Sequence, residues 1–100
     1  MARTAIHPGE ILSEELEVLE MSAAQLARHL DVPSNRISLI IAGKRGMTAD
    51  TAIRLGRYFG MSADFWMNLQ KSYELRSARA KMGDRINRIT ERPAADNAYC

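Results

Sequence analysis

Side chains able to contact DNA gather between residues 34 and 45. The amide of Asn35 can pair with two atoms of an adenine, and the guanidinium of Arg36 can fork onto a guanine or clamp a phosphate. Two hydroxyls, those of Ser34 and Ser38, can also contact DNA, and Leu39 can touch a thymine methyl group. Two cations in the following loop, Lys44 and Arg45, are better placed for phosphates than for bases. Together these side chains predict a surface that reads a DNA duplex.

The segment from residue 23 to 45 has the spacing of a helix-turn-helix, a motif that would hold these side chains in a major groove. Ala27 is small enough to stand where two helices cross, and Asp31 tolerates the left-handed turn between them. Ile37 and Ile40 are expected to anchor the second helix and leave its polar residues on the opposite face. Helix pairs with this spacing also occur in proteins that never touch DNA, so the polar and basic side chains, more than the pattern, favour DNA binding.

Periodicity and end signals predict three further helices and a short C-terminal piece. The first helix should start at His7 and Pro8 and bury Ile11, Leu12, Leu16 and Leu19. A second should run from a Thr48 cap to Gly60, with an inner face lined by Ala52, Ile53, Leu55, Tyr58 and Phe59. The last should start at a Ser62 cap. After Gly83, Asp84 is expected to cap a helical piece through Ile86 and Ile89 that Pro93 closes. The prediction is an all-α, five-helix domain in residues 1–75, with a helical extension and a frayed tail in 76–100.

Three polar residues outside the reading helix have simpler explanations than DNA contact. Ser22 and Gln25 have the spacing of a capping box, so Gln25 is expected to cap the motif's first helix, with a DNA contact as the alternative. Arg54 and Arg57 are most simply a solvated helix face.

The composition suits one all-helical domain, since 46% of the 100 residues are hydrophobic and only 6% are aromatic. The formal net charge of +2 is too small to argue for nucleic acid by itself. No apolar run approaches the roughly 20 residues that span a bilayer. The opening MARTAIHPGE has no signal-peptide pattern, so a cytoplasmic location is expected.

Catalysis, a metal site and a cofactor are not expected. His7, His29 and Cys100 are the only candidates for a nucleophile with its base or for a soft metal site, and no pair of them has suitable spacing. His7 is better explained as a helix-start residue and His29 as a solvated one. A single cysteine also excludes an internal disulfide.

An aromatic and apolar stripe, Phe65, Trp66, Leu69 and Tyr73, continues along the last helix at helical spacing. It either packs against the preceding helix, which should hold for at least one of the four residues, or forms a dimer contact. A two-fold operator requires two reading helices about 34 Å apart. A homodimer is therefore expected, with this helix as the candidate interface.

Four segments resemble the HigA-type antitoxins of bacterial toxin–antitoxin modules, within the wider Xre/Cro-like, lambda-repressor-like helix-turn-helix repressors. They are HPGEIL, NRISLIIAGKR, TADTAIRLGRYFG and FWMNLQKSYEL, and the match spans most of residues 7 to 75. The resemblance implies an antitoxin that neutralises a RelE-like, mRNA-cleaving toxin and represses its own operon. Two positions depart from the family: Ala23 stands where a phosphate-gripping glutamine is common, and Asp31 where the turn usually has glycine.

Charge is segregated along the chain, with acidic side chains near the start and basic ones beyond residue 75: Glu10, Glu14, Glu15, Glu17 and Glu20 against Arg76, Arg79, Lys81, Arg85, Arg88 and Arg92. The glutamates are either a solvated face or a surface for a basic toxin. The basic stretch is equally open to the DNA backbone or the toxin. Two other functions stay open: a free-standing repressor without a toxin, and an antitoxin whose motif no longer reads DNA.

Overall fold

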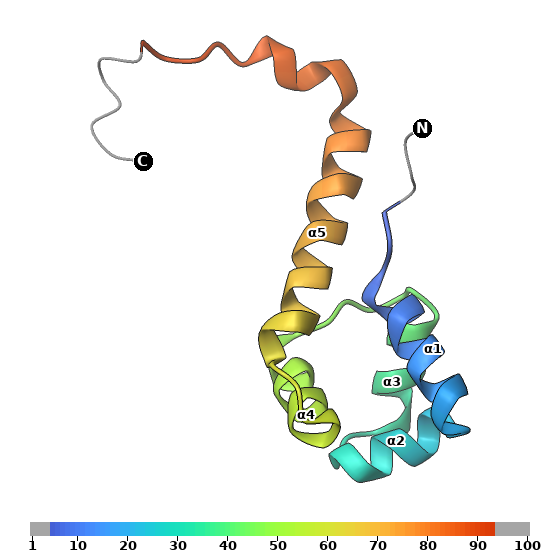
Figure 1. Cartoon of the computed structure of the whole chain (residues 1–100). Coiled ribbons are helices and arrows are strands. Elements are labelled where there is room, and N and C mark those ends of the chain that lie inside the picture. The colour runs from blue at the N-terminus through green and yellow to red at the C-terminus, as the bar shows by residue number, and fades with distance from the viewer. Residues whose placement is uncertain (1–4, 94–100) are drawn as a thin grey trace.

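Helices and connecting loops make up residues 5–93, the part of the chain that this computed structural model describes (Figure 1). The elements are α1 (Pro8–Leu19), α2 (Ala23–Leu30), α3 (Ser34–Ile41), α4 (Ala49–Phe59), α5 (Ala63–Met82) and the 3-10 helix η1 (Gly83–Arg88). The expected all-α class is confirmed. The predicted frayed tail and Cys100 lie outside the described residues.

Side-chain caps start most of the helices at the predicted residues. Ser22 and Gln25 form a reciprocal capping box on α2, Thr48 caps α4 and Ser62 caps α5. Left-handed residues then end α1, α2 and α4, with φ of 52° at Glu20, 59° at Asp31 and 70° at Gly60. Local sequence therefore sets where α1, α2, α4 and α5 begin and where α1, α2 and α4 end.

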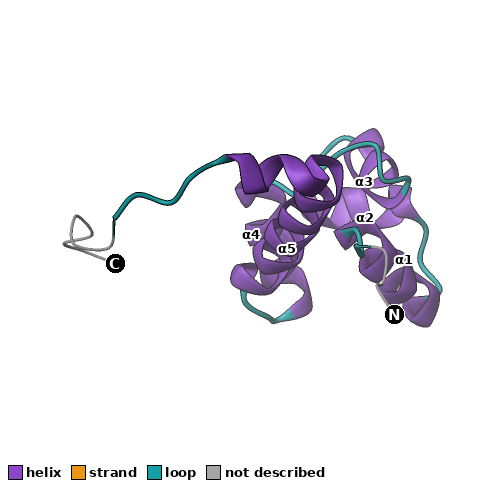
Figure 2. Cartoon of the chain, turned by 90° about the horizontal axis from the view of Figure 1, so that it is seen from above, coloured by secondary structure: helices purple, strands orange, loops and turns teal. Residues whose placement is uncertain are grey.

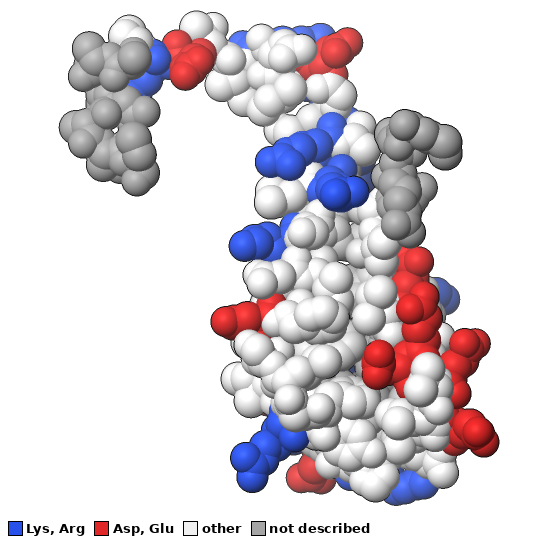
Figure 3. All heavy atoms as spheres, in the orientation of Figure 1, with Lys and Arg blue, Asp and Glu red and all other residues white. Residues whose placement is uncertain are grey.

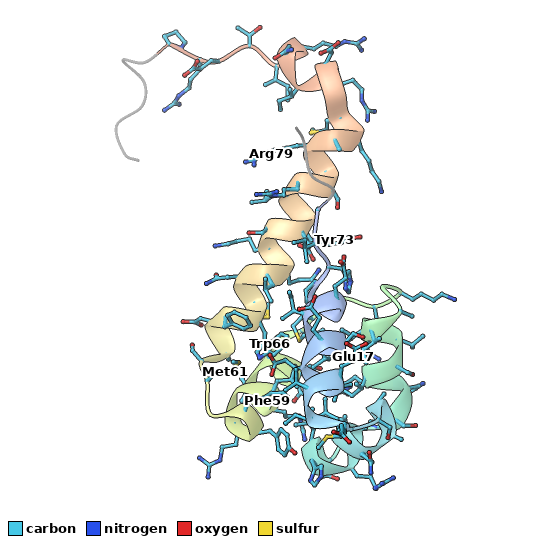
Figure 4. The ribbon with its side chains drawn as sticks, turned by 45° about the vertical axis from the view of Figure 1, so that its right-hand side comes forward. Glu17, Phe59, Met61, Trp66, Tyr73 and Arg79 are labelled. Carbon is cyan, nitrogen blue, oxygen red and sulfur yellow. The ribbon has the colours of Figure 1, made fainter. Side chains whose placement is uncertain are left out.

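The helices pack in two groups around one core. α2 packs chiefly on α3, and α4 chiefly on α5, while α1 bridges the two by lying against both α3 and α5. Viewed from above, α5 stands beside α4 on one side and α1 to α3 gather on the other (Figure 2). Trp66 is fully buried and reaches from α5 into this core, where its ring lies 6.4 Å from that of Phe59. Figure 4 shows Trp66 on the inner face of α5, above Phe59.

Three apolar residues predicted to be inside are instead exposed. Leu19 is 45% exposed because α1 ends there, and Met21, beyond the left-handed turn at Glu20, packs on the core in its place. On α4, Ile53 is 62% and Tyr58 37% exposed. The short helix turns only one stripe inward, and it uses Thr51, Ala52, Leu55 and Gly56.

The C-terminal end of α5 projects away from the body of the protein (Figure 1). The predicted boundary between residues 75 and 76 falls within this helix, which continues unbroken to Met82. Gly83, at φ 53°, redirects the chain into η1. The prediction that Asp84 caps this piece was wrong, because η1 already starts at Gly83 and has no side-chain cap. No helix in residues 5–93 is long and apolar enough to cross a membrane.

Candidate nucleic-acid interface

The outer face of α3 carries the side chains predicted to contact bases. Ile37 and Ile40 are fully buried, which turns Ser34, Asn35 and Ser38 to the solvent. Leu39 is partly exposed. The structure thus brings these four candidates together on one surface, as the helical period requires.

The amino end of α3 is left open by the protein. Pro33 precedes the helix and offers no side-chain cap, whereas α1, α2, α4 and α5 all have one. The first amide groups of a helix have no partner within the helix, and they attract anions. The open amino end of α3 is therefore suited to a phosphate. Farther along the helix, Ser38 Oγ donates to the Asn35 carbonyl at 3.3 Å, so the Ser38 side chain lies against the helix backbone.

Arg36 differs from its neighbours because its guanidinium is already engaged. Its Nη1 donates to Asp50 Oδ2 at 2.6 Å, and the same oxygen accepts from Arg54 Nε at 3.0 Å. The hydrogen bond from Arg54, and then that from Arg36, hold the pKa of the Asp50 carboxyl below its usual value. Arg36 therefore joins α3 to α4 as half of an ion pair.

The expectation that Arg54 belongs to a solvated face was wrong. Its Nη1 donates to the carbonyls of Leu30 at 2.7 Å and Asp31 at 3.3 Å. These carbonyls lie at the carboxyl end of α2, where a cation is favoured by the helix dipole. Arg54 thus joins α4 to the turn of the helix-turn-helix. Arg57 is exposed, as expected.

The loop after α3 presents Lys44 and Arg45 as exposed cations. Gly43, at φ 76°, closes α3, and Lys44 N–H donates to the Leu39 carbonyl at 2.9 Å. Farther on, the Met47 N–H donates to Gln70 Oε1 of α5 at 2.6 Å. Gln70 is buried, and its amide donates in turn to Glu74 at 2.8 Å. The loop that carries both cations is therefore tied to α5.

The start of α1 supports the other end of this arrangement. Gly9 lies so close to α3 that an added Cβ would stand 1.9 Å from the Ile40 carbonyl oxygen. His7 Nδ1 accepts from the Gly9 N–H at 2.9 Å, which confirms His7 as the helix-start residue. The His7 ring meets Tyr73 of α5 edge-on at a centroid distance of 4.8 Å.

Gln25 and Trp66 have different places in the structure, Gln25 on the exposed start of α2 and Trp66 in the core. Gln25 Oε1 accepts from the Ser22 N–H at 2.8 Å, which confirms the capping role. Trp66 belongs to the core, so its inclusion among surface dimer contacts was wrong. Of the same stripe, Phe65 is 41% exposed, and Leu69 and Tyr73 are partly buried.

Sequence reasoning missed Asp50, Arg54, Gln70 and Gly9 as residues that hold the site. Asp50 was visible only as an acidic residue in a first helical turn, and Gln70 carried no local signal. His29, expected to be solvated, is exposed and stacks on Tyr58 at 5.2 Å. Within residues 5–93 no group of three His, Cys, Asp or Glu side chains is arranged for a metal ion.

Surface charge is divided between α1 and the far end of α5. The glutamates of α1 form an acidic strip along one side of the body, and lysines and arginines gather on the visible face of the projecting part of α5 (Figure 3). In Figure 4 Glu17 of α1 and Arg79 of α5 mark these two regions.

Known proteins share both the sequence and this architecture, although no protein-family model matches the chain. Virulence-associated protein I of Dichelobacter nodosus is 53% identical over 75 residues, which cover 74% of this chain and 69% of that protein. The structure of an addiction module antidote protein of a HigA family from Coxiella burnetii aligns with a TM-score of 0.87 at 48% identity, covering 91% of this chain and all of that one.

The antitoxin HigA of Pseudomonas aeruginosa, solved with the higBA promoter, aligns with a TM-score of 0.83 at 50% identity, covering 87% of this chain and 96% of that one. Identity at this level over nearly whole chains goes beyond a shared fold. The chain belongs to the HigA-type family of helix-turn-helix antitoxins.

Proposed function

We propose that this protein binds operator DNA through α3, represses its own operon and neutralises a RelE-like, mRNA-cleaving toxin. One observation carries the DNA-binding part. α3 turns Ser34 and Asn35 outward at an uncapped amino end, and the loop that follows its carboxyl end carries two exposed cations. The same helix then has base-reading side chains at its start and phosphate-binding groups at both of its ends.

A salt-dependent gel shift on the DNA upstream of the gene tests this role. Asn35→Ala should lower the preference for this DNA over a scrambled duplex, because Asn35 is assigned to a base. Lys44→Ala should weaken binding to both duplexes alike and reduce the salt slope by about one unit. Lys71→Ala, an exposed lysine on α5, is the charge-matched control. An unchanged salt slope in Lys44→Ala would refute the phosphate assignment.

A homodimer follows from the two-fold symmetry that helix-turn-helix operators share with their proteins. Exposed Phe65 and partly buried Leu69 and Tyr73 on α5 remain the candidates for its contact. Sedimentation of Phe65→Ser tests this choice. A dimer of unchanged stability in that variant would place the interface elsewhere.

The toxin is expected to be a basic protein, because RNA-cleaving proteins must approach an anionic substrate. Support comes from α1, whose glutamates form no salt bridge with any part of residues 5–93. Co-expression with the adjacent reading frame should give co-purification and rescue of growth. Reversing the charge of Glu14 and Glu17 should weaken the complex, and reversing Asp64 and Glu91 should not.

Two results would change this assignment. Undiminished toxin binding after reversal of Glu14 and Glu17 would move the contact off α1. Absence of co-purification, with DNA binding intact, would make the protein a repressor without a toxin partner.

A further inference from the structure

We infer that Asp50 is a specificity-determining residue that positions Arg36 for a guanine, although Asp50 itself lies on α4 rather than on the reading helix. The inference rests on the proposed binding of DNA by α3. It assigns the discrimination at one base pair of each half-site to an arginine–carboxylate pair. Asp50 is a positioning residue here, because it acts through Arg36.

The geometry restricts Arg36 on two sides. Nη1 is bound to Asp50 Oδ2, and Nε is buried with no hydrogen-bond partner among the described residues. Its side chain is only 24% exposed, against 56% for Asp50. Within residues 5–93 the guanidinium has no partner other than Asp50, so Nη2 and the second proton of Nη1 stay available for an acceptor outside the protein. The Arg36 fork is thus held with one edge open.

Arg54 fixes the position of the carboxylate itself. It shares Oδ2 of Asp50 with Arg36, and its own Nη1 is anchored on the Leu30 and Asp31 carbonyls. Asp50 is therefore placed relative to the turn that sets the angle between α2 and α3. A carboxylate held in this way restricts the arginine to fewer orientations toward a base pair than solvent would.

The fold gains little from the pair, because ion pairs open to solvent contribute weakly to stability. Recognition gains more. A long side chain that is already ordered loses less freedom when it binds, and a forked donor pairs with guanine O6 and N7 only in one orientation. The negative charge of Asp50 also opposes binding of Arg36 to any nearby phosphate. The pair should therefore raise selectivity and lower non-specific affinity.

The test is selection from a randomised duplex library, followed by measurement of binding to the selected duplex and to its single-base variants. Wild-type protein should select a guanine at one position that Arg36→Ala no longer prefers. Asp50→Asn should reduce that preference by roughly tenfold, the scale of one bidentate base contact, and bind scrambled DNA more tightly. Preferences at other positions should change little.

Asp64→Asn is the matched control. Asp64 lies in the first turn of α5 as Asp50 does in that of α4, and it makes no ion pair among the described residues. The same loss of charge there should raise affinity for all duplexes slightly and leave the guanine preference intact. Thermal melts of both variants show whether each remains folded.

The double variant Arg36→Ala with Asp50→Asn separates positioning from a general effect on structure. If Asp50 acts through Arg36, adding Asp50→Asn to Arg36→Ala should change no base preference further. Equal selectivity of wild type and Asp50→Asn would overturn the inference alone. A wild-type protein that selects no sequence would overturn the DNA-binding proposal and this inference with it.

Discussion

Replacing Gly9 by alanine should destabilise the protein, although alanine is the better helix former. Gly9 is the second residue of α1 and lies against the last turn of α3. Its missing side chain lets the two backbones approach until an added Cβ would be 1.9 Å from the Ile40 oxygen. The propensity of alanine and the packing of α1 therefore act in opposite directions, and their magnitudes decide the sign.

Propensity alone would stabilise the variant by at most about 1 kcal/mol. To reach an ordinary contact distance, α1 must move away from α3 by roughly 1.5 Å, which loosens Leu12 and Leu16 in a closely packed core. Overpacking of this kind costs about 1–3 kcal/mol, and a clash with backbone, which cannot rotate away, belongs at the upper end. A net loss of about 2 kcal/mol should lower the melting temperature by roughly 10 °C.

Thermal and urea unfolding followed by circular dichroism measure the change. Ala24→Gly provides the matched control, because Ala24 is the second residue of α2 and is exposed. That variant reports the propensity difference at the same helical position without a packing contact. If Gly9→Ala were as stable as wild type, or more stable by the amount that Ala24→Gly loses, the close approach of α1 and α3 would not be a constraint in solution.

Three other changes have expected outcomes. Gln70→Leu leaves the Met47 N–H buried without a partner and should lower the free energy of unfolding in urea by about 1–3 kcal/mol. It should also weaken DNA binding, because the loop is no longer held on α5. An unchanged unfolding free energy and DNA affinity would refute the tie between the loop and α5. The lowered pKa of Asp50 means that its carboxylate makes a small stabilising contribution to the fold above the unfolded-state pKa, and this contribution is lost as pH falls through the folded-state pKa. The melting temperatures of wild type and Asp50→Asn should therefore converge once the pH is below the folded-state pKa. Trp66→Ala should lose about 3–5 kcal/mol by calorimetry, whereas Phe65→Ser should lose much less, since only Trp66 is core.

Signals confined to a few neighbouring residues made much of the fold predictable. The Ser22 and Gln25 box, the left-handed Asp31 and the Ile37 and Ile40 anchors depend on spacing within one or two turns, and the structure confirms each of them. The prediction failed where a helix has more apolar positions than one face can bury. On α4, Ile53 follows directly after inward-facing Ala52, and helical geometry turns it to solvent.

The contacts that hold the candidate site could not be predicted in the same way. Arg36 and Asp50 are 14 residues apart, and Met47 and Gln70 are 23 apart. Each pair meets only because α4 and α5 fold back onto the motif, and no local period encodes that return. Arg54 shows the limit most clearly, since its place on a polar helix face concealed bonds to the backbone of α2.

These distant contacts also explain why a helix-turn-helix of this size needs the rest of the chain. α2 and α3 have 8 residues each, too short to be stable as isolated helices. α3 is held near its start by Arg36 on Asp50 and at its last turn by Gly9, and the loop beyond it by Gln70. HPGEIL contains Gly9, TADTAIRLGRYFG contains Asp50 and Arg54, and FWMNLQKSYEL contains Trp66 and Gln70. The segments outside α3 that identify the family are thus the ones that position α3. Substitutions in these segments should therefore alter DNA binding, although the residues replaced do not contact DNA.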